Sequence, residues 1–420
     1  MRWILWALFI LLLPSVILAQ SGNDVIDAGL EAGAEIAQAI SEKNFTGTME
    51  KLKTKTNPFL KMIGPLIKGV SSLLGLQIES TELKFMRNML SKIENRFDQV
   101  DQRLEEIARK IDWNRVNIQF FTFEKKILAM KMELDKFFNA SSDSEFSSIS
   151  DTFLKMYECV YENSAQMLYR HIVSHESTFS SNILTEAMRA NEYNRRDVQA
   201  FLLGLSKLVI VGAEIEIAYY SQKLPTYLDA HENKWITQIN NMREAMEKLD
   251  IVIETNFMEV ATEDAKKILA HSRGKSNVIV ANEIFGKLMD KFYWRYWFVA
   301  VYGDIKEHHV WLCNETATSI FHFSGFNLLL ASTPEDTTSL DITAAQSALR
   351  QAQTQKKGWW FAKKTMNARE VSDSVKIDKT CSKYSGLAVV RLTTNVATKF
   401  SKKDYLVKEQ KNPYGLFLFR

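Results

Sequence analysis

The chain has 420 residues, of which 46% are hydrophobic and 25% are charged, and its formal net charge at pH 7 is +3. This composition is too apolar for an intrinsically disordered protein, and it is sufficient to bury the cores of two or three domains. Because positive and negative charges nearly balance, a globally basic surface is excluded and any basic contact surface has to be local.

The first residues have the three parts of a secretory signal peptide. Arg2 supplies positive charge, Trp3–Leu13 form an apolar run, and the small residue Ala19 ends the segment. The sequence therefore predicts residues 1–19 as a signal peptide, and a secreted, extracellular protein that begins at Gln20. The alternative is an uncleaved anchor, but the apolar run is shorter than the roughly 20 residues that cross a bilayer as a helix.

Export gives meaning to the cysteines and to three glycosylation motifs. In an oxidising compartment three cysteines allow one internal disulfide, and we expect it between Cys313 and Cys381 because both lie in the C-terminal region. Cys159 then remains, with a buried free thiol or an intermolecular bridge as the two alternatives. The acceptor motif predicts a glycoprotein with N-linked glycans at the surface residues Asn44, Asn139 and Asn314.

The scarcity of proline predicts long helices. Between Pro65 and Pro225 there is none, and within this stretch twelve positions spaced three and four apart form a heptad seam. Eleven of the twelve are apolar: Leu83, Met86, Leu90, Ile93, Phe97, Val100, Leu104, Ile107, Ile111, Asn114, Ile118 and Phe121. We expect a coiled-coil-like helix over about residues 83–128, whose seam is covered either by other helices of the same chain or by a second copy in a homo-oligomer.

The following region also has helical patterning. The polar stretch Asn139–Ser150 predicts a loop, with Asp151 as the N-cap of the next helix. Val198–Tyr220 predicts a further apolar helix. Its charged residues, Lys207, Glu214 and Glu216, make it too polar to face lipid, so we expect it in a protein core.

The pattern changes at about residue 292, where short apolar runs alternate with polar breaks, as is typical of strands and turns. A helix-like insert covers Asp341–Gln355. The expected fold class is mainly α: an elongated helical bundle over residues 20–291, followed by a smaller α+β domain over residues 292–420 that the disulfide closes.

No catalytic motif is present: the sequence lacks a nucleophile elbow, a dinucleotide fingerprint and a zinc-protease helix. His308, His309 and His322 form a loose group in which strand pairing could bring two rings together, although structural histidines are the simpler interpretation. We therefore predict that the protein is not an enzyme and needs no cofactor or metal. A secreted hydrolase is a third hypothesis, which requires a carboxylate beside these histidines.

Two segments are candidates for membrane contact. In the first, three aromatic residues stand between four lysines: Lys356, Lys357, Trp359, Trp360, Phe361, Lys363 and Lys364. Such a segment can place indole rings among lipid headgroups, or its rings can fill the small domain while the lysines extend to solvent. The second is Pro58–Leu76, which is amphipathic and glycine-bearing, and which either enters lipid or packs in the core. The same alternatives apply to Val25–Ile40.

Residues 83–128 carry a resemblance to a known family. Phe97-Asp98, Asp101, Leu104, Ile107, Ile111-Asp112-Trp113 and Phe123-Glu124, with the later run Tyr293–Tyr302, resemble the cephalotoxin-like proteins, a group that also includes the fish protein rapunzel. The best-known member is a salivary toxin, whereas rapunzel is not described as one. The resemblance brings no catalytic residues.

The sequence thus predicts a secreted, non-enzymatic helical protein that acts through contact with an unknown protein or cell-surface partner. The alternative is a membrane-active, pore-forming-like toxin that contacts lipid. Export excludes nucleic acid as a partner.

Overall fold

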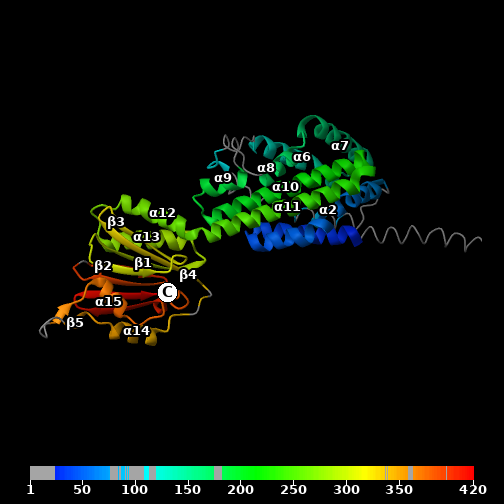
Figure 1. Cartoon of the computed structure of the whole chain (residues 1–420). Coiled ribbons are helices and arrows are strands. Elements are labelled where there is room, and N and C mark those ends of the chain that lie inside the picture. The colour runs from blue at the N-terminus through cyan, green and yellow to red at the C-terminus, as the bar shows by residue number, and fades with distance from the viewer. Residues whose placement is uncertain are drawn as a thin grey trace, which may run out of the picture. The chain divides into compact units, whose positions relative to one another are not determined.

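The computed structural model describes residues 24–75, 84, 87–89, 91, 93, 108–112, 120–174, 182–335, 337, 339–357, 363–393 and 395–420. The chain divides into two compact units after Val252 (Figure 1). The predicted signal peptide lies outside the described residues, as do most of the heptad seam and the aromatic residues Trp359, Trp360 and Phe361.

The helical unit begins with a helical hairpin. A helix over residues 24–41 turns back into α2 (Phe45–Gly75). The two helices approach so closely that a Cβ atom at Gly29 would lie 2.3 Å from the Met62 Cβ, and Glu35 pairs with both Lys51 and Lys55. The apolar residues of the segment that begins at Pro58 are buried: Phe59, Leu60, Met62, Ile63, Leu66, Ile67, Val70 and Leu74. Packing in the core is therefore confirmed for the described part of this segment.

The central helix of this unit is α10 (Arg195–Lys223). The other labelled elements of the unit are α6 (Phe120–Asn139), α7 (Asp143–Met156), the π-helix η1 (Tyr157–Tyr161), α8 (Ser164–Val173), α9 (Ile183–Ala190), the 3-10 helix η2 (Pro225–Tyr227) and α11 (Leu228–Thr255). α10 is buried continuously from Phe201 to Ala218 and contacts α2, α6, α8 and α9. A helix that is apolar on all sides has to lie inside a protein, so the core prediction for Val198–Tyr220 is confirmed.

Polar side chains join α10 to α11. At one end Arg195 donates to both carboxylate oxygens of Asp250, at 2.9 and 2.6 Å. Towards the other end the buried Glu216 Oε2 accepts from Trp235 Nε1 at 3.1 Å and lies 3.0 Å from His231 Nε2. These contacts give two charged residues of α10, Arg195 and Glu216, partners on α11, as burial of charge requires.

The predicted continuous helix over residues 83–128 is wrong. Arg109–Asp112 form a turn and an irregular stretch, and α6 starts only at Phe120. The spacing of apolar residues reflects which positions are buried. The same spacing can continue across a break between two helices, so it did not show where one helix ends. Of the seam residues that are described, Ile93 and Ile111 are buried and Phe121 is exposed, and the Ile93 Cδ1 would lie 3.1 Å from a Cβ at Gly33. The same chain thus covers the seam there, while self-association stays an untested prediction.

The C-terminal unit starts earlier than the expected residue 292. The helices α12 (Phe257–Ala270) and α13 (Asn277–Lys291) belong to it, because Phe257, Ala261, Ile284 and Leu288 share one apolar core with strand residues such as Trp297. Their helical pattern alone could not tell which neighbour their apolar faces cover.

Two antiparallel four-stranded sheets form the middle of this unit. The first has the order β3 (Ala317–Phe323), β4 (Phe326–Pro334), β1 (Arg295–Gly303), β8 (Ala397–Phe400), and the second β2 (His308–Leu312), β7 (Gly386–Arg391), β10 (Tyr414–Phe419), β9 (Leu406–Lys411). Alternate residues of β1 face opposite sides: Trp297 and Val299 join the core with α12 and α13, whereas Phe298 stacks on Phe419 of the second sheet, with ring centroids 4.4 Å apart. Burial on both faces explains the nearly continuous apolar runs of these strands.

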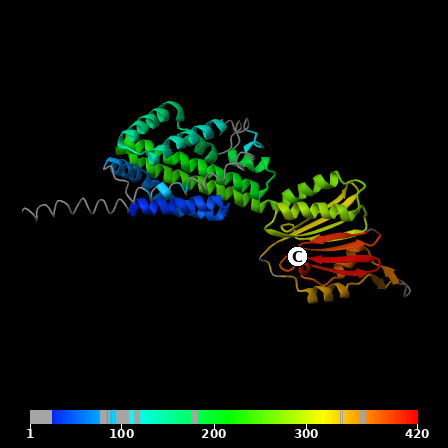
Figure 2. The same ribbon diagram turned by 180° about the vertical axis from the view of Figure 1, so that it is seen from behind.

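Helices cover the second sheet as well. α14 (Ile342–Gln351) and α15 (Ala368–Ser374) pack on the side chains of β7 and β10 that point away from the first sheet. The unit therefore has four layers, helix, sheet, sheet and helix, and Figure 2 shows them from behind. The fold prediction, mainly α with an α+β C-terminal part, is confirmed.

The disulfide prediction is also confirmed: Cys313 and Cys381 are bonded, with an S–S distance of 2.11 Å. Cys159 has a free thiol, but it is exposed, so the alternative of a buried thiol is wrong and an intermolecular bridge stays a prediction. It lies in η1, where the wider π-helical turn moves Glu158, Cys159 and Val160 to the surface between the buried Phe153 and Tyr161.

Candidate functional site

The lysines singled out in the sequence lie on a small β-hairpin. β5 (Gln355–Lys357) and β6 (Lys363–Thr365) pair only with each other, outside the two large sheets, and all six residues are exposed (Figure 1). The five residues between these strands include Trp359, Trp360 and Phe361, and they lie outside the described residues.

The register of the hairpin places like charges opposite each other. Lys356 pairs with Lys364, and Lys357 pairs with Lys363. Like charges in direct cross-strand positions destabilise a β-hairpin. A negatively charged partner would relieve this repulsion, and the hairpin is therefore a candidate contact site for anionic groups.

The carboxylate of Glu370 pairs with Lys356 on one face of the hairpin. The hydrogen bond from Lys356 lowers the pKa of Glu370, and the backbone N–H of Asn367 and the charge of Lys364 lower it further. Glu370 is held by a capping box at the start of α15, so its position is fixed. Within the described part of the chain, Lys357 and Lys363 on the other face have no ion pair.

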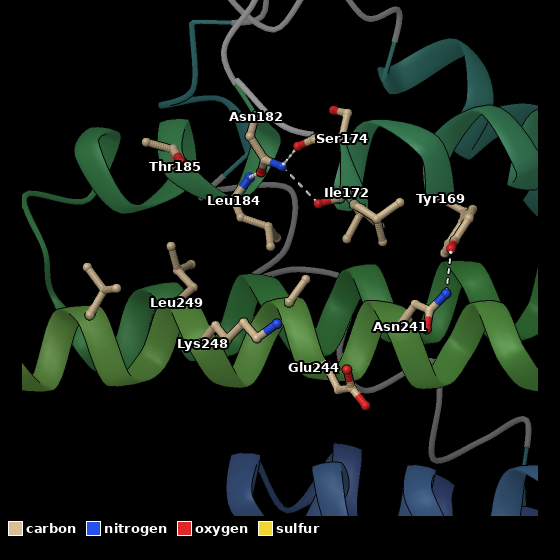
Figure 3. Close-up of a pocket in the computed structure, with 13 residues that line it drawn as sticks. Tyr169, Ile172, Ser174, Asn182, Leu184, Thr185, Asn241, Glu244, Lys248 and Leu249 are labelled. Carbon is tan, nitrogen blue, oxygen red and sulfur yellow. Dashed lines mark hydrogen bonds between the residues drawn. The ribbon is translucent and has the colours of Figure 1, made fainter. Parts of the chain in front are cut away.

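A pocket of about 580 Å³ lies in the helical unit between α8, α9 and α11 (Figure 3). Ile172, Leu184 and Leu249 are buried and form an apolar floor. Glu244 and Lys248 are exposed at its rim. The remaining lining residues are Tyr169, Val173, Ser174, Asn182, Thr185, Asn241, Ala245 and Val252.

Several polar side chains of this pocket make hydrogen bonds that connect or cap the surrounding helices. Asn241 Nδ2 donates to the Tyr169 hydroxyl at 3.4 Å, which links α11 to α8. Asn182 accepts from Leu184 N at 2.7 Å as the N-cap of α9 and donates to the carbonyl groups of Ile172 and Ser174. Among the described residues that line the pocket there is no histidine or cysteine. Its shape and chemistry fit an inserted apolar group better than a reacting substrate.

Residues 77–274 match the family model described as the cephalotoxin-like middle helical domain. The chain thus contains a cephalotoxin-like middle helical domain. The pocket lies within the matched residues, whereas the lysine hairpin lies in the C-terminal unit, outside them. The comparison with curated proteins gave no match, and neither did the comparison with solved structures.

The three glycosylation motifs of this chain are open to solvent. Asn44, Asn139 and Asn314 are all exposed, as attachment of a glycan requires. The Asn44 Oδ1 accepts from Gly47 N at 2.9 Å at the start of α2, and Asn139 Nδ2 donates to Asp135 O at 3.1 Å. Glycosylation itself stays a prediction.

The fold separates His309 from the other two histidines of the group. His308 and His322 come together beside Asp304, whereas His309 has Asp373, Arg369 and Lys379 near it. In the described part of the chain, no group of three or more His, Cys, Asp and Glu side chains is arranged to hold a metal ion. None of the described helices is both long and apolar enough to cross a membrane.

Sequence patterns did not reveal the pocket, because α8 and α9 form it together with α11, which lies much further along the chain. The available signal was weak: Asn241, Glu244 and Lys248 repeat at helical spacing and place a polar stripe on one face of α11. Such a stripe is equally typical of a solvated helix face.

Proposed function

We propose that this cephalotoxin-like protein is secreted, is not an enzyme, and acts through contact with a protein or cell surface. The observation that carries the proposal is the exposed lysine hairpin, whose two cross-strand lysine pairs favour an anionic partner. The pocket in the middle domain, which is lined by both apolar and polar residues, offers a second contact feature into which a partner side chain can insert.

The test uses the glycosylated protein from Gln20 to Arg420 and measures its binding to cells at several salt concentrations. In the variant Lys357→Glu plus Lys363→Glu, the ion pair of Lys356 with Glu370 stays intact. We expect apparent affinity to fall by at least about 2 kcal/mol, roughly 30-fold, because each lysine at an anionic surface contributes about 1 kcal/mol and each introduced glutamate is repelled by that surface. Binding of the wild type should weaken as salt increases.

The matched control is Lys376→Glu plus Lys403→Glu. Both residues are exposed lysines of the same unit, and the change in net charge is identical. Binding that falls equally in both variants would reflect net charge alone and refute the hairpin as the contact site. Binding that survives in the hairpin variant would refute it as well.

A membrane-active protein is the second candidate. The observation in its favour is that Trp359, Trp360 and Phe361 connect the two lysine strands, since aromatic and basic residues together suit a lipid interface. Dye release from neutral and anionic liposomes distinguishes the two candidates. Release that is lost on Trp359→Ala plus Trp360→Ala supports membrane activity, whereas cell binding without release supports contact alone.

A further inference from the structure

One end of the C-terminal sandwich brings two imidazole rings together. His308 is the first residue of β2, and His322 lies near the end of β3 in the other large sheet. Their ring centroids are 6.2 Å apart and their planes differ by 34°. Asp304, in the connection between β1 and β2, pairs with His322.

Both rings use the same nitrogen to contact one short segment. His308 Nδ1 lies 2.9 Å from the carbonyl oxygen of Ile305, and His322 Nδ1 contacts the carboxylate of the adjacent Asp304. A carbonyl or carboxylate oxygen accepts a hydrogen bond, so each Nδ1 carries the proton and each neutral ring has a lone pair on Nε2. Within the described residues neither Nε2 has a hydrogen-bond partner.

A buried amide fixes the backbone around these rings. Asn327 is fully buried on β4, and its Oδ1 accepts from the His322 N–H at 2.9 Å. Its Nδ2 donates to Gly303 O at 3.0 Å and Ile305 O at 3.1 Å. His322 has a φ of +55°, a left-handed conformation, and the hydrogen bond from its backbone N–H to Asn327 supports that conformation. The Asn327 amide therefore positions the segment from Gly303 to Ile305, which orients both rings, and it also positions the backbone of His322.

We propose that His308 and His322 bind a divalent transition-metal ion, Zn²⁺, Ni²⁺ or Cu²⁺, through their Nε2 atoms. Asp304 and the Ile305 carbonyl orient the two ligands, in the arrangement typical of metal-binding histidines. Water completes the coordination, because in the described part of the chain these histidines belong to no group of three or more potential ligands.

The distance between the rings suits this site. Two imidazoles on one metal, with metal–nitrogen bonds of about 2.0–2.1 Å, have their centroids roughly 5–6 Å apart. The observed 6.2 Å is close to this range, and the exposed His322 can close the difference by rotating its ring. The side chains of His322 and Asp304 are 48% and 41% exposed, so an ion can reach the site from solvent.

The experiment is titration of the full secreted chain with Ni²⁺ and Cu²⁺ by calorimetry, with electron paramagnetic resonance of the Cu²⁺ complex. All proteins carry Cys159→Ser, because an exposed thiol would also bind these ions. We expect one saturable site and hyperfine coupling to two nitrogen atoms. His322→Asn should weaken binding at least roughly tenfold, since it removes a ligand, and asparagine tolerates the left-handed backbone.

His309→Asn is the matched control, because successive residues of a strand point to opposite faces. It should leave affinity and the two-nitrogen signal unchanged. Asp304→Asn should weaken binding roughly 10- to 100-fold, as expected for the loss of an orienting partner. Unchanged binding in His322→Asn, equal loss in His309→Asn, or no saturable binding by the parent protein would each overturn the proposal.

Discussion

Glu232 is a carboxyl group buried where α11 meets α2. It is 4% exposed, and its Oε1 would lie 4.0 Å from a Cβ at Gly64. Burial, together with the nearby charge of Asp229, raises the pKa of Glu232 to about 7 although Lys61 opposes the shift. The folded chain therefore binds this proton more tightly than the unfolded chain, for which the pKa is 4.5. The resulting stability is complete below pH 4.5 and is lost as the pH rises through about 7.

Glu232→Gln should remove this pH dependence. The variant should resist urea more than the wild type at pH 8, by about 3 kcal/mol at most, and equally at pH 4.5. The measurement is urea unfolding of the helical unit at both pH values. Glu247→Gln on the same helix is the control, because Glu247 is partly exposed and pairs with Arg243. A wild-type advantage at pH 8 would contradict the burial argument for Glu232.

The disulfide was predictable because the number and positions of the cysteines decided it. Three cysteines in a chain that is predicted to be secreted allow one disulfide, and the pair Cys313 and Cys381 followed from their shared region. The exposure of Cys159 was not predictable, since the π-helical turn that moves it outward has no sequence signature at this level. The pairing of His308 with His322 depends on strands of two different sheets, which their spacing does not specify.

At the scale of elements, a buried ion pair joins α12 to α13. Lys291 Nζ lies 2.5 Å from Asp264 Oδ2, and both side chains are less than 5% exposed. Removing one partner of a buried pair leaves the other charge uncompensated, which costs about 3–5 kcal/mol. Asp264→Asn should destabilise the C-terminal unit by about 3 kcal/mol in thermal unfolding.

The neighbouring Glu263 supplies the control for this ion pair. Glu263 bonds Lys266 at 2.7 Å, but its side chain is 58% exposed. Surface pairs contribute little, so Glu263→Gln should change stability by no more than about 0.5 kcal/mol. Similar losses in the two variants would mean that burial of Lys291 and Asp264 is not what gives their pair its strength.

Element types were predictable and element ends were not. The apolar run of α10, the strands after residue 292 and the helix α14 follow from patterning that burial imposes. The expected loop over Asn139–Ser150 is mostly helix α7, because Ser142 caps Glu145 N at 3.2 Å and Glu145 bonds back to Ser141. Serine and aspartate suit both loops and helix starts, so composition could not separate the two.

The hairpin illustrates the same limit for the candidate site. Composition singled out the lysines and aromatic residues between 356 and 364, but two interpretations of that segment were open. Strand pairing that isolates β5 and β6 from both large sheets is a tertiary property. The pairing of the lysines in a separate hairpin therefore became visible only in the fold.

For the whole molecule, two units with separate cores imply two separable unfolding transitions. The cores of the C-terminal unit contain only residues beyond Val252. The disulfide lies entirely within this unit, between residues 68 positions apart. A change to the disulfide should therefore act on one transition, and the helical unit provides an internal reference.

Replacing Cys313 and Cys381 by serine should cost about 4 kcal/mol, the loop-closure entropy expected for a loop of this length. In calorimetry the transition of the C-terminal unit should move down by roughly 10 °C, while that of the helical unit stays in place. Cys159→Ser is the control, because this exposed thiol lies in the other unit and should shift neither transition. Equal shifts of both transitions in the double serine variant would show that the two units unfold as one cooperative body, against the division after Val252.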